Sequence, residues 1–104
     1  MTNFFEIKIC GINDKNSMLA AIDAEADYIG LVFYEKSPRN LELVIAETLI
    51  TFRNKKSKIV ALTVDANDEF INEIKKKIAP DYFQLHGNET PARCKEIRSK
   101  FNTP

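Results

Sequence analysis

The sequence predicts an α/β fold in which four strand–helix units follow one another. Short runs rich in β-branched or aromatic residues recur four times along the chain. Each run is followed by a residue type that caps helices and then by apolar residues at helical spacing. No linker or low-complexity stretch separates the units. Strands that alternate with helices imply a parallel sheet with right-handed crossovers.

The first unit is a strand at about residues 5–10 and a helix capped by Asn13 or Asp14. The second unit is a strand at residues 28–34, a loop that contains residues 37–40, and a helix capped by Asn40. The apolar residues expected on these two helices are Met18, Leu19, Ile22 and Ala26, then Leu41, Val44, Ile45, Leu49 and Phe52.

The third unit is a strand at residues 58–64 followed by a helix that Asn67 or Asp68 opens. The fourth unit is a strand at residues 81–86, with Thr90 as the cap and Pro91 as the first residue of its helix. The apolar stripe expected on the third helix is Phe70, Ile71, Ile74 and Ile78.

Four such units fit a small doubly wound sheet or half of an eight-unit barrel, and periodicity alone does not separate them. Side-chain alternation favours the barrel slightly. Lys8 and Cys10 share one face of the first strand, and Gln84 and His86 share one face of the fourth. A central strand of a doubly wound sheet is usually apolar on both faces. Polar inner faces suit a barrel interior better.

Composition and charge argue against several classes of protein. The 104 residues make one domain at most, and 15 basic and 15 acidic residues give no net charge. Nucleic-acid binding, which normally shows as a basic excess, therefore has little support. No apolar run approaches the roughly 20 residues that cross a bilayer, and the N-terminus lacks the features of a signal peptide. Two distant cysteines without a C-x-x-C motif predict free thiols in the cytoplasm.

Four segments carry a resemblance to a known family: KICGIN at 8–13, LVFYEKSPRN at 31–40, VALTVD at 60–65 and FQLHGNETPARCKEIRSKF at 83–101. In this order they resemble the phosphoribosylanthranilate isomerases of tryptophan biosynthesis. The resemblance implies a TIM (β/α)8 barrel, which needs at least about 200 residues. Residues 1–104 are then expected to be its N-terminal (β/α)4 half, with the C-terminal half absent.

The resemblance implies an Amadori rearrangement of N-(5-phosphoribosyl)anthranilate to 1-(2-carboxyphenylamino)-1-deoxyribulose 5-phosphate. This aldose-to-ketose isomerisation needs an acid, a base and no metal or other cofactor. The family assigns the base to the cysteine of KICG, which is Cys10 here. Lys8 has the same parity, and a positive neighbour favours a thiolate. The alternative interpretation is that Cys10 is a small buried hydrophobic residue with no role in catalysis.

The resemblance also implies the residues that bind the substrate. Arg39, in the loop after the second strand, is expected to grip the anthranilate carboxylate. His86 and Gln84 belong to the Q-L-H-G segment, and with Lys8 they are expected to contact the substrate or shape its pocket. The general acid, an aspartate on strand five, and the phosphate-binding loops after strands seven and eight would lie outside this chain.

Three other features of the sequence are expected to have little or no catalytic role. Cys94 is expected to pack inside the fourth helix, and residues 75–77, all lysine, are expected on a solvated helix face. Asp65, where the family commonly has asparagine, has little expected role in the chemistry.

Two alternatives to the isomerase remain open at this point. A non-catalytic signalling module would need an acidic cluster after the first strand, where this chain has Cys10, Gly11 and Ile12. A half-barrel with a structural or interaction role would look much like this sequence. Self-association, or docking of the missing half, is the partner interaction expected of an open half-barrel.

Overall fold

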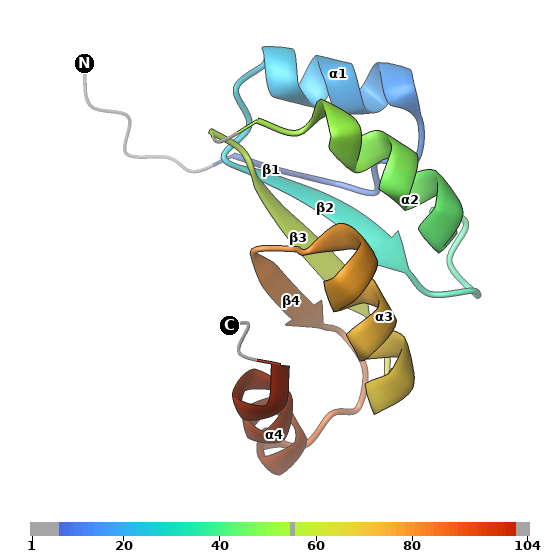
Figure 1. Cartoon of the computed structure of the whole chain (residues 1–104), viewed down its shortest axis with the longest axis vertical. Coiled ribbons are helices and arrows are strands. Elements are labelled where there is room, and N and C mark those ends of the chain that lie inside the picture. The colour runs from blue at the N-terminus through green and yellow to red at the C-terminus, as the bar shows by residue number, and fades with distance from the viewer. Residues whose placement is uncertain (1–6, 55, 102–104) are drawn as a thin grey trace.

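Four strand–helix units make up the structure, a computed structural model that describes residues 7–54 and 56–101 (Figure 1). The strands form one parallel sheet in the order β1-β2-β3-β4. The elements are β1 Lys8–Cys10, α1 Lys15–Asp23, β2 Tyr28–Phe33, α2 Leu43–Leu49 with the short 3-10 helix η1 Ile50–Phe52, β3 Lys58–Thr63, α3 Asp68–Ile78, β4 Tyr82–Leu85 and α4 Pro91–Phe101. The predicted order of elements is confirmed, with strands shorter than expected. Residues 5 and 6 of the expected first strand lie outside the described residues.

One face of the sheet, called the outer face, packs against the helices. Buried residues of α1, α2 and α3 join the strand residues of this face in one core, and Ile97 of α4 packs in a smaller cluster with Phe83 and Leu85. The outer face consists of Ile9, Ile29, Leu31, Phe33, Ile59, Ala61, Thr63, Phe83 and Leu85. A doubly wound sheet would carry helices on both faces. The helices of the described chain lie on one face, as in the wall of a barrel.

The opposite, inner face of the sheet mixes polar and apolar side chains. It consists of Lys8, Cys10, Tyr28, Gly30, Val32, Lys58, Val60, Leu62, Tyr82 and Gln84. The side chain of Lys8 on β1 donates a hydrogen bond to Gln84 on β4. The rings of Tyr28 and Tyr82 also meet edge to face, with centroids 6.1 Å apart. These contacts join side chains of strands that are not neighbours, so the sheet curves around its inner face.

Three of the four helices begin at the residues that the sequence indicates. Asp14 accepts from the backbone N–H of Ser17 at 2.7 Å, and this bond lowers the pKa of Asp14. Asn67 accepts from the N–H of Phe70 at 2.9 Å. Thr90 Oγ1 accepts from the N–H of Arg93 at 3.1 Å, with Pro91 as the first helical residue. Each cap satisfies an N–H that has no partner inside the helix.

The predicted cap at Asn40 is wrong. The N–H of Asn40 donates to Ser37 O at 3.1 Å, and the N–H of Leu41 donates to Val32 O at 2.8 Å. These bonds hold the chain in a turn against the end of β2. Helix α2 therefore begins only at Leu43, after Glu42, whose side chain makes no cap bond.

Some predicted core residues lie elsewhere. On α2, Val44 is 66% exposed and Ile45 is 45% exposed, because Ala46 and Leu49 supply the buried side of this short helix. Leu19 is also exposed. Ala26 is buried but lies beyond α1, which ends at Asp23, before the left-handed Glu25 at φ 57°.

The prediction for Cys94 is half right. The residue lies in α4, but its side chain is exposed rather than packed. The prediction for residues 75–77 is confirmed in the main, since Lys76 and Lys77 are exposed and Lys75 is half-buried, all off the buried stripe of Ile71, Ile74 and Ile78.

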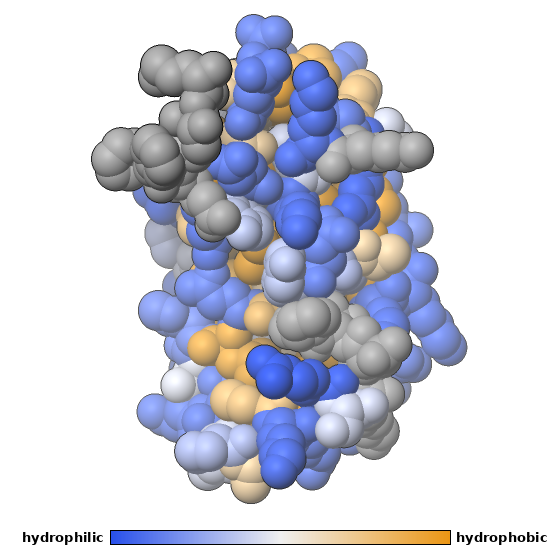
Figure 2. Space-filling view, turned by 90° about the vertical axis from the view of Figure 1, so that its left-hand side faces the viewer, coloured by the Kyte–Doolittle hydropathy of each residue, from blue (hydrophilic) through white to orange (hydrophobic). Residues whose placement is uncertain are grey.

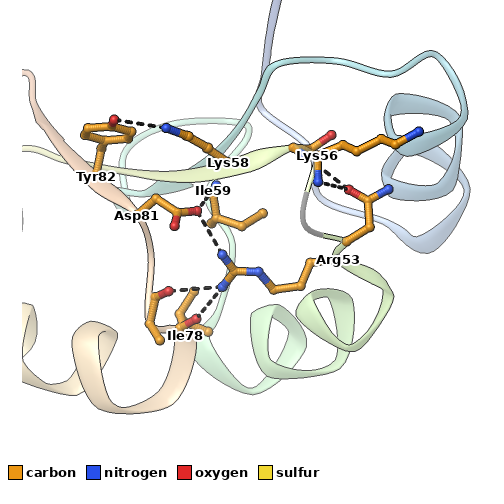
Figure 3. A network of polar contacts seen from close by, with 10 residues as sticks. Arg53, Lys56, Lys58, Ile59, Ile78, Asp81 and Tyr82 are labelled. Atoms are coloured by element: carbon orange, nitrogen blue, oxygen red, sulfur yellow. Dashed lines mark hydrogen bonds and ion pairs between the residues drawn. The ribbon is translucent and has the colours of Figure 1, made fainter.

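A polar network fastens the N-terminal ends of β3 and β4 (Figure 3). Arg53 donates to the carbonyls of Ile78 at 3.3 Å and Ala79 at 3.0 Å, where α3 ends on a left-handed residue. The same guanidinium pairs with Asp81 at 2.9 Å, and Asp81 accepts from the N–H of Ile59 at 2.8 Å. The network joins η1, α3, β3 and β4 at the end of the sheet away from Cys10.

The surface is mixed in character. On the face shown in Figure 2, hydrophilic side chains surround separate hydrophobic patches. Within the described part of the chain, no helix has the length and apolar character needed to span a membrane.

Candidate active site

The candidate site lies at the C-terminal ends of the strands. Cys10 is the last residue of β1, Arg39 lies in the loop after β2, and His86 directly follows β4. All three line one open depression of about 410 Å³. The depression is completed by Gly11, Val32, Tyr34, Ser37, Leu62 and Val64. The carboxyl ends of parallel strands are where α/β folds of this kind hold their ligands.

The Cys10 side chain is exposed to solvent. The reading of Cys10 as a buried structural residue is therefore wrong for this structure. Gly30 is its partner on β2, and a Cβ at Gly30 would lie only 3.1 Å from the Cys10 sulfur. A glycine inside a strand marks a close approach of this kind. Gly30 thus leaves the space beside the thiol open.

Arg39 crosses the backbone that leaves β1. Gly11 has φ 77°, which favours glycine, and a Cβ there would lie 2.5 Å from Arg39 Cδ. The Gly11 N–H donates to Gly30 O at 3.0 Å, so the backbone beneath Arg39 is hydrogen-bonded to β2. Among the described residues, no carboxylate forms an ion pair with Arg39. Its guanidinium is available to an anionic ligand beside Cys10.

His86 lines the depression from the end of β4, the edge strand opposite β1. Its backbone N–H donates to Thr63 O at 2.9 Å, which continues the ladder between β3 and β4, and its side chain is exposed. The imidazole and the guanidinium of Arg39 are the two basic groups that line the depression. The arrangement supplies a thiol for proton transfer and cationic or hydrogen-bonding groups for a polar, anionic ligand.

Lys8 and Gln84, also predicted as substrate-binding residues, are not among the residues that line this depression. They lie on the inner face and bind each other. The Lys8 ammonium therefore has Gln84 as its hydrogen-bond partner, and its effect on the Cys10 thiol stays a prediction. The structure thus brings Cys10, Arg39 and His86 together and places Lys8 with Gln84 beside them.

Two features of the site were missed from the sequence, namely the roles of Gly11 under Arg39 and Gly30 beside Cys10. For Gly30 the signal was available, because a glycine within a strand pattern indicates close approach. Gly11 follows β1, and its contact with Arg39 has no such local signal. Within residues 7–54 and 56–101, no three or more His, Cys, Asp or Glu side chains gather in a way that would hold a metal ion.

Comparison with known proteins gives a consistent family. The model of the N-(5'-phosphoribosyl)anthranilate (PRA) isomerase family matches residues 7–103. An N-(5'-phosphoribosyl)anthranilate isomerase of Bradyrhizobium diazoefficiens is 43% identical over 98 residues, which are 94% of this chain and 44% of the relative. The chain spans about half the length of the curated relatives that it matches.

Solved structures agree with this comparison. The chain superposes with a TM-score of 0.88 and 28% identity on a phosphoribosylanthranilate isomerase in complex with reduced 1-(o-carboxyphenylamino)-1-deoxyribulose 5-phosphate, covering 93% of this chain and 50% of that one. Monomers generated from the dimeric isomerase of Thermotoga maritima match with a TM-score of 0.85 and 29% identity, over 93% of this chain and 49% of theirs. The fold is thus the (β/α)4 half of a TIM barrel. The chain belongs to the N-(5'-phosphoribosyl)anthranilate isomerase family.

Proposed function

We propose that these residues form the N-terminal half of an enzyme that isomerises N-(5-phosphoribosyl)anthranilate to 1-(2-carboxyphenylamino)-1-deoxyribulose 5-phosphate. The observation that carries the proposal is the exposed Cys10 thiol in one depression with Arg39 and His86. The family match and the product-like ligand named for a solved relative support the same reaction.

The reaction moves a proton between two sugar carbons. A proton delivered to the ring oxygen opens the furanose, and the amine nitrogen stabilises the resulting cation at C1. A base then removes the proton from C2, which leaves an enol with a double bond between C1 and C2. The enol becomes the ketone when C1 takes up a proton and the C2 hydroxyl loses one. Cys10, as a thiolate, is the proposed base. A positioned base of this kind typically raises the rate by a factor of about 10² to 10⁴.

The other predicted site residues are assigned to binding. Arg39 can hold the anthranilate carboxylate in a bidentate pair, because its guanidinium has no ion pair among the described residues. His86 contacts the substrate across the depression, and Lys8 with Gln84 shapes the inner face below it. Binding of this kind orients the reacting carbons before proton transfer.

The remaining parts of the reaction are assigned to a second half-barrel. The general acid and the phosphate-binding loops would come from strands five to eight, which would close the sheet between β4 and β1. Residues 1–104 are then one half of a single barrel domain. We use the name completed barrel for these 104 residues joined to, or mixed with, the C-terminal half of a family member. A cytoplasmic location and a small phosphorylated substrate belong to the same proposal, as does self-association of the half-barrel when the C-terminal half is not bound.

The proposal is tested by turnover in the completed barrel. Anthranilate fluorescence, followed with freshly made substrate, should change with time only when both halves are present. A completed barrel that folds but leaves the fluorescence unchanged would contradict the assigned reaction. The same sample would then favour an interaction role for the half-barrel.

A further inference from the structure

We propose that Glu89 is a positioning residue that fixes the loop carrying His86 at the rim of the Cys10 depression. The proposal deepens the proposed function, because it concerns how that site holds one of its binding groups. Glu89 lies in the turn between β4 and α4 and touches no part of the depression itself.

The Glu89 carboxylate joins two loops through their backbones. Its Oε2 accepts from the N–H of Asp65, after β3, at 2.9 Å. Its Oε1 accepts from the N–H of Gly87, after β4, at 2.7 Å. Hydrogen bonds between a charged carboxylate and backbone N–H groups are stronger than neutral ones. One side chain therefore holds the C-terminal ends of two neighbouring strands in register.

The side chain of Asp65, after β3, accepts a hydrogen bond from the loop after β4. Its Oδ1 accepts from the N–H of Asn88 at 2.8 Å, and its backbone is left-handed at φ 48°. A Cβ at Gly87 would lie 2.6 Å from Asp65 Oδ1 and 2.8 Å from Asp65 N. The two loops are therefore in direct contact, and a side chain at position 87 would push them apart. We call these hydrogen bonds of Glu89 and Asp65 between the two loops the Glu89 clasp.

His86 depends on this clasp for its position. Its own N–H is held by Thr63 O, and the next N–H, of Gly87, is held by Glu89. Both peptide groups that flank the His86 Cα are thus fixed, although the imidazole is exposed. Without Glu89, the second anchor is lost and the imidazole can leave the depression that it shares with Cys10.

The first experiment measures backbone amides in this 104-residue chain by NMR. Glu89→Gln replaces one accepting oxygen by an NH₂ group, which faces a backbone N–H. Hydrogen exchange at Asp65 or Gly87 should become about tenfold faster, as expected for one lost hydrogen bond, and the His86 amide should become more mobile. Glu73→Gln, on the exposed side of α3, is the matched control and should change neither. Unchanged exchange at both amides, or an unchanged His86 amide, in Glu89→Gln would overturn the proposal.

A second measurement separates positioning from general stability. In the completed barrel, Glu89→Gln should raise KM more than it lowers kcat, because His86 is a binding group. Asp65→Asn keeps the oxygen that Asn88 uses and should retain the wild-type KM, whereas Glu89→Asp is too short to span both loops and should not rescue it. A wild-type KM in Glu89→Gln would overturn the role of the clasp in binding. A completed barrel without turnover would count against the proposed function and leave the exchange result as the test of the clasp.

Discussion

Lys8 on β1 donates a hydrogen bond to Gln84 on β4, although these strands are the two edges of the described sheet. Two strands lie between them, so a flat sheet would keep the side chains well apart. The contact shows how strongly the sheet curves around its inner face. A wall with this curvature brings the ends of distant strands around one space, which is how Cys10 and His86 come to line the same depression.

The Cys10 thiol is the group whose removal should matter most. Cys10→Ala in the completed barrel should lower kcat by about 10² to 10⁴ while the fold survives, because a positioned base is lost. The change deletes an exposed sulfur and leaves no buried cavity. Steady-state kinetics by anthranilate fluorescence measures the effect.

Cys94 provides the control for this experiment. It is also an exposed free cysteine, but it lies on α4 and does not line the depression. Cys94→Ala should keep wild-type turnover. Full activity in Cys10→Ala would eliminate the proposed base.

Arg39 should act mainly in binding. Arg39→Ala in the completed barrel is expected to raise KM by about 10- to 100-fold, the usual worth of a hydrogen bond to a charged group. Arg98→Ala, on an exposed position of α4, is the matched control and should leave KM unchanged. If kcat alone collapses while KM stays constant, Arg39 acts in the transition state and the binding role is wrong.

Local signals in the sequence predicted much of this fold. Side-chain caps at Asp14, Asn67 and Thr90 act over three residues, so they can be read directly from the chain. The cap at Asn40 failed because backbone bonds to Ser37 and from Leu41 to Val32, set by the end of β2, hold the turn. Tertiary context overrode the local preference there.

Three of the five predicted site residues line the depression, Lys8 and Gln84 do not, and the roles of all five stay predictions. The resemblance placed Cys10, Arg39 and His86, and the structure brings them into one depression. The Glu89 clasp was not predictable, because it joins loops that lie 24 residues apart in the chain. The exposure of Cys94 also depends on packing that periodicity does not show.

The chain by itself is expected to associate. In the described sheet, β1 and β4 each have one side without a strand partner, and such edges offer backbone groups to a neighbour. The inner-face strand residues include Lys8 and Lys58 but no carboxylate. Two copies that associate through this face would therefore bring like charges together, and this repulsion opposes association at low salt. Light scattering at micromolar concentration should show dimers or larger species, increasingly so as salt screens the lysines. A monomer at every salt concentration would contradict this expectation.

The Arg53 network should contribute measurably to stability. Arg53→Ala removes bonds to the end of α3 and to Asp81, and is expected to cost about 1 to 2 kcal/mol in the free energy of unfolding. Lys56→Ala breaks only an exposed pair with Glu25 at 3.8 Å and should cost about 0.5 kcal/mol or less. Urea unfolding measures both variants. Equal costs for the two would show that the network in Figure 3 adds nothing beyond an ordinary surface pair.

The central claim is that these residues supply the base, Cys10, and the residue that binds the substrate carboxylate, Arg39. The general acid and the phosphate-binding loops would lie in a second half. The most direct measurement follows anthranilate fluorescence with freshly made substrate, first with this chain alone and then after the C-terminal half of a family member is added. The account predicts no turnover by the chain alone and turnover on mixing, lost again with Cys10→Ala. Robust turnover by the 104 residues alone, or turnover of the mixture that survives Cys10→Ala, would contradict it.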